Sequence, residues 1–253
     1  MSGVAHVTVT YRKSAKAWPG GRPSFKWLVK GARLYDPRKD STVPGGSGAH
    51  RWGDHSTYEW TENTVVCRSN FQWGIWSDTA ANRLLMVGPG RSMRELPPAQ
   101  TIAAANICDE LVPNKAGALR ARYRCGGVIR ADERWSDVDA AFAAACAGDL
   151  ASRGGSWLLD PGAAQTPVAT FTDGDILTGS TIEESDKVGR RELVNTVTGN
   201  FIDPDRLWQE SELPLRRSLA DVTEDGEPRE LAIGLRLVHQ RIIGQRVLEI
   251  ARR

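Results

Sequence analysis

Two histidines and an aspartate lie in one loop and could ligate a metal ion. His50, Asp54 and His55 fall in a stretch rich in Gly, Pro, Ser and Asp. A hydrolytic zinc site, however, normally draws its ligands from several elements of a fold. The two other histidines, His6 and His239, lie far away in the sequence. We therefore expect a solvated polar loop here, with no metal and no cofactor.

Paired acidic residues offer a second possible chemistry, because glycosidases cut sugar chains with two carboxyl groups. The acids in question are Asp173, Asp175, Glu183, Glu184 and Asp186. They lie in turn-like sequences, which favour Asp for structural reasons. The chain also lacks a GxSxG nucleophile motif, and its GPGRSM stretch lacks the GKS or GKT ending of a phosphate loop. We therefore expect no catalytic residue.

Three arginines alternate along a stretch that is predicted to be a strand or a hairpin, and they could contact phosphate. Arg120, Arg122 and Arg124 share one face, and Tyr123 and Cys125 share the other. An arginine-bearing strand face is also typical of a solvated or subunit-facing edge, where the charges discourage unwanted pairing. We favour this second interpretation.

The composition is that of a globular protein. The 253 residues are 40% hydrophobic and 25% charged, and the net charge of +2 is too balanced to indicate nucleic-acid or membrane binding by itself. No apolar run is long enough for a signal peptide or a membrane span. The four cysteines form no CxxC motif and are expected to be buried free thiols, which suits synthesis in the cytoplasm. They are Cys67, Cys108, Cys125 and Cys146.

The charges are distributed unevenly along the chain. Residues 1–60 contain ten Lys or Arg and four Asp or Glu, whereas residues 201–230 contain four Arg and nine acids. Two such surfaces could attract each other within one chain or between chains, or could be ordinary solvated faces.

The N-terminal part is predicted to be β-structure. The alternation of Val7, Val9 and Tyr11 predicts a strand over residues 4–12. The stretch FKWLVKGARLYDPR, residues 25–38, predicts a hairpin that turns at Gly31. A long loop follows, and loops of that length usually serve binding or assembly.

The middle of the chain is predicted to be mostly helical. Helices are expected over residues 62–76, 97–112 and 133–155, the last two packing in one small subdomain. Prolines begin the second helix, and Ser136 should cap the third, with Asp139 three residues later. The apolar stripe of the third helix consists of Val138, Phe142, Cys146 and Leu150.

The C-terminal part combines short strands with one helix. Apolar runs separated by DPG, TDGD and IDPD turns predict antiparallel β-structure up to about residue 232. From residue 231 onward the sequence predicts an amphipathic helix that should be only partly covered. Its apolar stripe includes Leu235, Ile242, Val247 and Ile250. The fold class is therefore α+β.

Five stretches, in this order, resemble one protein family. They are FKWLVKGARLYDPRKDSTVPGGSGAHRWGD, WTENTVVCRSNFQWGI, IAAANICDELV, ARYRCGGVIRADERWSDVDAAFAAACAGDLASRGGSWLLDPGA and RRELVNTVTGNFIDPDRLWQ. Together they resemble tail-hub proteins of long-tailed phages, of the tip attachment protein J (host specificity) type, whose relatives occur in prophages and gene transfer agents. The resemblance covers residues 4–250. Family proteins are longer, so the chain is expected to correspond to a middle portion of one.

The resemblance implies a structural virion protein rather than an enzyme. Three hub copies would form a barrel-like ring, with β-rich portions in residues 1–60 and 156–253 and a small α+β insertion in residues 61–155. The implied partners are two further copies, the tail tube, other tail-tip proteins, viral DNA passing through the lumen without sequence-specific binding, and a host receptor bound by parts outside this chain. The protein would be made in the bacterial host cytoplasm and reside at the virion tail tip.

Two other functions remain open from the residues alone. One is a tail-associated cell-wall hydrolase, which would need the His50 or Asp173 chemistry described above. The other is a free-standing bacterial binding module, which the nine tryptophans would suit because Trp is enriched at interfaces.

Overall fold

The computed structural model describes residues 7–10, 12, 14, 16–21, 24–77, 84–176, 179 and 193–252. The chain divides into two compact units, Met1–Ala32 and Arg33–Arg253. The described residues of the first unit form turns and extended backbone, with no helix or strand. The strand predicted over residues 4–12 is therefore wrong for its described part. A lone strand is unstable without partners and a buried face, and Val7 and Val9 are 65% and 40% exposed.

The hairpin predicted over residues 25–38 is also wrong. Residues 25–32 form no strand, and Leu34 pairs instead with Glu59 in a single antiparallel bridge. The Leu34 N–H donates to the Glu59 carbonyl at 2.8 Å. The chain then enters a short 3-10 helix, η1 (Pro37–Lys39), whose first residue cannot donate to a strand ladder.

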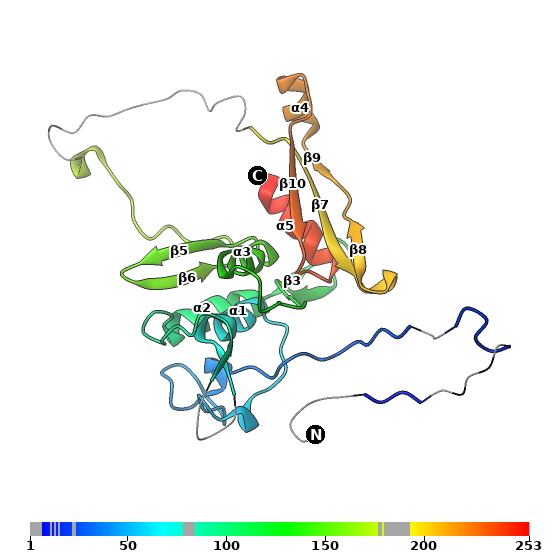
Figure 1. The fold of residues 1–253 in the computed structure, drawn as a ribbon. Coiled ribbons are helices and arrows are strands. Elements are labelled where there is room, and N and C mark those ends of the chain that lie inside the picture. The colour runs from blue at the N-terminus through cyan, green and yellow to red at the C-terminus, as the bar shows by residue number, and fades with distance from the viewer. Residues whose placement is uncertain are drawn as a thin grey trace. The chain divides into compact units, whose positions relative to one another are not determined.

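The three helices predicted for the middle of the chain are confirmed as α1 (Thr64–Trp73), α2 (Pro98–Asp109) and α3 (Trp135–Ala145) (Figure 1). The first packs against both of the others. Asn63 caps α1 by accepting hydrogen bonds from two backbone N–H groups, and Gly74, with φ of 88°, ends it. Only glycine adopts that backbone conformation without strain.

The predicted cap of α3 is wrong. The helix begins one residue before Ser136, and its N-terminus has no side-chain cap. Asp139 is buried and binds Arg68 of α1 instead. The helix also ends earlier than predicted, at Ala145, because Ala147 adopts a left-handed φ of 46°. Leu150 therefore lies beyond the helix, where it is 43% exposed.

Three two-stranded antiparallel hairpins flank the helices. They are β1 (Ile75–Trp76) with β2 (Leu85–Val87), β3 (Leu111–Pro113) with β4 (Leu119–Ala121), and β5 (Asp149–Arg153) with β6 (Ser156–Asp160). The strand predicted around the three arginines is thus confirmed only as far as Ala121. Beyond it the chain crosses the core without regular structure, although Tyr123 and Cys125 are buried as expected.

A four-stranded sheet forms the C-terminal part. Its central strand β7 (Thr196–Asp203) pairs antiparallel with β8 (Gln209–Glu212) and β9 (Arg216–Arg217), as the turns predicted. Its last strand, β10 (Glu230–Leu235), pairs parallel with β7, contrary to the prediction. The helix α4 (Leu219–Asp225) and the loop after it provide the connection that a parallel pair requires.

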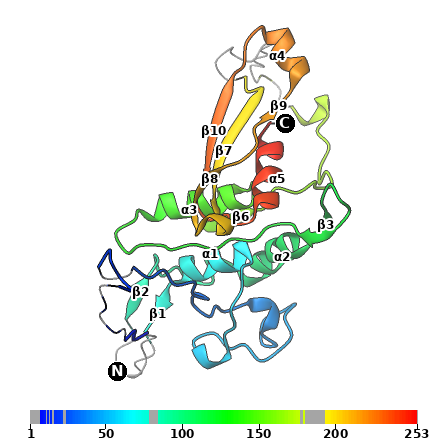
Figure 2. The ribbon, with the colours of Figure 1, turned by 90° about the vertical axis from the view of Figure 1, so that its right-hand side faces the viewer.

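The C-terminal helix is shorter than predicted. Residues 231–235 belong to β10, and α5 begins only at Arg241 and ends at Arg252. Gly234 is a poor helix former, and pairing with β7 satisfies the backbone of this stretch. Figure 2 shows α5 lying along the sheet, where it packs against β7. Of its predicted stripe, Leu235 and Val247 are 2% exposed, whereas Ile242 and Ile250 remain 40% and 36% exposed, so partial coverage is confirmed.

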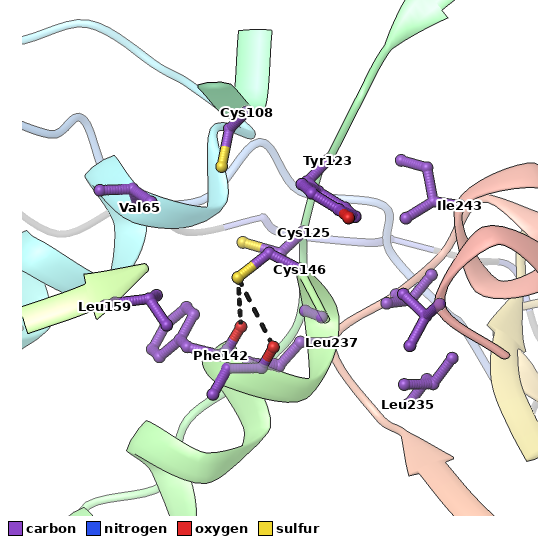
Figure 3. Packing of buried hydrophobic residues seen from close by; sticks show 14 of the residues in the cluster. Val65, Cys108, Tyr123, Cys125, Phe142, Cys146, Leu159, Leu235, Leu237 and Ile243 are labelled. Atoms are coloured by element: carbon purple, nitrogen blue, oxygen red, sulfur yellow. Dashed lines mark hydrogen bonds between the residues drawn. The ribbon is translucent and has the colours of Figure 1, made fainter. Parts of the chain in front are cut away.

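The described residues therefore form an α+β fold, and none of their sheets closes into a barrel. Residues 161–172 belong to no helix or strand and are followed by the 3-10 turn η3 (Asp173–Asp175). One hydrophobic core joins the helices to the C-terminal sheet (Figure 3). It runs in sequence from Val65 to Leu248, so it draws on both the predicted insertion and the predicted second β portion.

All four cysteines are free thiols, as predicted. Cys108, Cys125 and Cys146 are buried in the core, and Cys67 is half-buried. Burial raises the thiol pKa of Cys108 to about 12 and raises that of Cys146 well above its ordinary value. Thiols of this kind stay protonated and react slowly.

Candidate assembly surfaces

His50, one of the candidate metal ligands in the loop, has a structural role. His50 is 3% exposed, and its Nδ1 accepts a hydrogen bond from the Asp36 N–H at 3.1 Å. Its ring lies against Tyr35 and Tyr58, with ring centroids 6.2 and 6.1 Å away. His50 therefore helps to hold the loop closed on itself.

The two other candidate metal ligands in the loop also contact neighbouring residues of the chain. Asp54 accepts hydrogen bonds from the Ser56 N–H at 3.1 Å and from its hydroxyl at 2.6 Å, which caps the 3-10 helix η2 (His55–Thr57). His55 packs against Tyr58, 5.0 Å between ring centroids. Within the described ranges, no three His, Cys, Asp or Glu side chains are arranged to hold a metal ion.

The predicted acidic pairs are only partly described. Asp175 accepts hydrogen bonds from the Thr172 N–H at 2.8 Å and from its hydroxyl at 3.0 Å. These two hydrogen bonds lower the pKa of the Asp175 carboxyl, which therefore stabilises a turn as an ionised acceptor. The side chain of Asp173 lies outside the described residues, and so do Glu183, Glu184 and Asp186.

Two of the three candidate phosphate-binding arginines pair with acids of the same chain. Arg122 binds Glu110 at 2.8 Å, and Arg124 binds Asp109 at the C-terminal end of α2. Burial raises the pKa of the Asp109 carboxyl, but hydrogen bonds and charges from Arg38 and Arg124 outweigh burial and lower it. Arg120 is exposed.

A buried polar cluster orders the long loop, so the prediction of a solvated polar loop is wrong for these residues. Tyr35 is fully buried, and its backbone N–H and C=O bind the Asn70 side chain at 2.9 and 2.7 Å. Its hydroxyl donates to Asp40 at 2.8 Å. Because α1 supplies Asn70, the long loop is anchored to the helical core.

The buried histidine predicts a loss of stability in mild acid. Burial lowers the pKa of His50, and the structure gives its Nε2 no hydrogen-bond partner among the described residues. As the pH falls, the unfolded chain therefore binds a proton at this histidine before the folded chain does. The contribution of neutral His50 to stability is fully present above the unfolded pKa of about 6.5 and is lost as the pH falls below it. We expect the free energy of unfolding in urea to decrease from about pH 7 to about pH 5.

The variant His50→Gln should flatten this pH profile, because glutamine keeps an acceptor for the Asp36 N–H and does not titrate. His55→Gln, in the same loop but only partly buried, is the matched control and should keep the wild-type slope. Equal slopes for the wild type and His50→Gln would contradict the assignment.

The first unit carries an exposed apolar and basic sequence. Residues 1–32, called the basic segment below, contain six Lys or Arg and no Asp or Glu. Among its described residues, Phe25 and Trp27 are 48% and 56% exposed, and their rings stack 6.1 Å apart. Leu28 and Val29 are 76% and 71% exposed. Contiguous apolar exposure of this kind usually marks an interaction site.

The main sheet of the second unit has an open edge along β10. β10 pairs only with β7, and no strand of the described chain lies on its other side (Figure 1). The residues just before and at the start of β10, 221–230, contain five acids and one arginine. The open edge therefore combines unpaired backbone groups with negative charge.

No described helix is both long and apolar enough to cross a membrane. No protein-family model and no curated protein matches the chain.

Proposed function

We propose that the chain is a structural subunit of a phage tail-tip hub. In this role three copies form the ring that closes the tail tube, and viral DNA passes through the lumen without sequence-specific contacts. The tail tube and other tail-tip proteins are the partners, and a host receptor is bound by parts of the hub outside this chain. The site of action is the virion tail tip.

The distribution of the family-like stretches supports this proposal. Four of the five contribute side chains to one hydrophobic core, for example Val66, Cys108, Phe142 and Phe201. The remaining stretch, which begins at Phe25, supplies Tyr35, and Asn70 of α1 accepts a hydrogen bond from the Tyr35 N–H. From residue 33 onward, the stretches that resemble one family in sequence thus also lie in one folded unit, as parts of a single module should.

The observation that carries the proposal is the amount of interaction surface that a lone chain leaves uncovered. The basic segment exposes Phe25, Trp27, Leu28 and Val29, and β10 has an open edge. Exposed apolar surfaces of this kind are typical of chains that bind other chains. A subunit of a ring must meet neighbours on two sides, and different surfaces on the two sides suit a closed cyclic assembly.

Light scattering tests the self-association that the proposal requires. We expect weak, reversible association that increases with protein concentration up to three copies. Association should weaken as salt rises well above about 0.1 M, because exposed charges are then screened beyond about 10 Å.

Electron microscopy tests the location directly. An antibody against the chain should label one end of the tails released by cells that encode it, and should not label heads or tail shafts. A strictly monomeric protein with no salt dependence, together with unlabelled tails, would count against the hub function.

A further inference from the structure

We infer that residues 25–30 of one copy pair as an added strand with the open edge of β10 in a second copy. This inference rests on the proposed function and specifies how neighbouring subunits bind. It assigns a binding role to the exposed part of the basic segment, and it commits to another copy of this chain as the partner.

The open edge of β10 lacks the features that usually protect an edge strand. Its sequence, ELAIGL, contains no proline and no lysine or arginine, and its only charge is Glu230 at the start. No bulge interrupts its register with β7, in which Ala232 lies opposite Thr198. Unprotected edges of this kind readily accept another strand, since they present a row of unpaired N–H and C=O groups.

Residues 25–30 have the sequence and length of a β-strand. The segment FKWLVK matches the six residues of β10 in length. Phe25, Trp27 and Val29 alternate with Lys26, Leu28 and Lys30, so the three larger apolar side chains fall on one face of an extended strand. All three are exposed, so this face is uncovered in the single chain.

One face of residues 25–30 and one face of β10 are both apolar. In β10, Leu231 and Ile233 point to one side of the sheet, because side chains alternate along a strand. Leu231 is 39% exposed and Ile233 is half-buried. A row of Phe25, Trp27 and Val29 beside β10 would extend this apolar face, and the added strand would satisfy the backbone groups of the edge.

Charge favours the same pairing. The basic segment has no acidic residue, and the stretch at residues 221–230 has five. Four of the acids there are exposed, namely Asp221, Glu224, Glu227 and Glu230. Two basic segments repel each other, and each is attracted to the acidic end of β10 in the neighbour.

Thiol crosslinking between two versions of the full chain tests this pairing. One version carries Leu28→Cys and an affinity tag, and the other carries Ala232→Cys and no tag. The native thiols are mostly buried and react slowly, so a short bifunctional thiol reagent should link mainly the introduced cysteines. We expect a crosslinked product containing one tagged and one untagged chain, with the linked peptides identified by mass spectrometry.

The matched control places the second cysteine on the opposite edge of the same sheet, as Glu210→Cys in β8, where Glu210 is exposed. This control should give at least roughly tenfold less product, which corresponds to about 1.4 kcal/mol of preference. Equal product from the two edges, more from β8, or no product at any concentration would overturn the inference.

A charged substitution tests the same edge without crosslinking. Ala232→Lys should weaken self-association roughly tenfold, because a lysine protects an edge strand and repels the basic segment. Ser152→Lys adds the same charge to an exposed position of β5 and should leave association unchanged. Circular dichroism of both variants checks that they fold.

The outcomes separate this inference from the proposed function. If the wild type assembles and labels tail ends but Ala232→Lys assembles equally well, subunits pair elsewhere and only the inference is overturned. If the wild type neither associates nor labels tails, the hub function itself fails.

Discussion

Replacing Asp139 with alanine should destabilise the second unit by about 3–5 kcal/mol, the usual cost of leaving a buried charge unpaired. Arg68 is only 1% exposed, and its Nε and one terminal nitrogen bind the two Asp139 oxygens at 2.6 and 2.8 Å. A further Arg68 nitrogen donates to the Trp157 carbonyl at 3.1 Å. The substitution leaves the guanidinium buried among α1, α3 and β6 with one hydrogen bond.

Urea unfolding measures this loss, with Asp137→Ala as the matched control. Asp137 lies in the first turn of the same helix but is exposed, so its loss should change the free energy of unfolding by at most about 1 kcal/mol. The double variant Arg68→Met with Asp139→Ala also removes the unpaired positive charge of Arg68. It should be more stable than Asp139→Ala alone, because an apolar side chain can occupy the site at lower cost. A loss below about 1 kcal/mol for Asp139→Ala would contradict the unpaired-charge argument.

Replacing Phe142 with alanine should cost about 3–5 kcal/mol, because it removes a large buried ring and leaves a cavity. Phe142 is 3% exposed, and its ring lies 6.2 Å from that of Phe71, which joins α3 to α1. Figure 3 shows its side chain in the same cluster as Cys125 and Leu159.

The chain offers a matched control for the same chemical change. Phe171 is 84% exposed, so Phe171→Ala should alter the free energy of unfolding by less than about 0.5 kcal/mol. Similar losses for the two variants, or a loss below about 1 kcal/mol for Phe142→Ala, would mean that Phe142 is not part of the core.

The helices could be predicted because their signals are local. The prolines at the start of α2 and Gly74 after α1 mark the ends of these helices in the sequence itself. The C-terminal prediction failed where two patterns overlap. Residues 231–238, LAIGLRLV, have apolar side chains at both strand and helix spacing. The pairing of residues 231–235 with β7, more than thirty residues earlier, decided the outcome, and no local pattern reveals it.

The loop cluster shows a second limit of sequence reasoning. His50 and Asp54 were recognisable as possible ligands, but Asn70, which binds the backbone of Tyr35, looked like an ordinary helix residue. The buried partner of Arg68 was likewise mistaken for part of a helix cap. The opposite charges of residues 1–60 and 201–230 follow directly from the sequence. The open edge of β10 depends on which strands pair, so it could be found only in the three-dimensional structure.

The pairing of β7 with a strand that lies later in the chain has a consequence during synthesis. On the ribosome, β7 emerges first, and Val197 and Phe201, which are nearly fully buried in the finished fold, must wait for β10 and α5 to cover them. Translation adds about 5–20 residues per second, so this apolar strand stays uncovered for seconds. A chain that terminates early, before α5, lacks Ile243, Val247 and Leu248 of the core. Such a product should be cleared by proteases rather than compete with complete chains for partners.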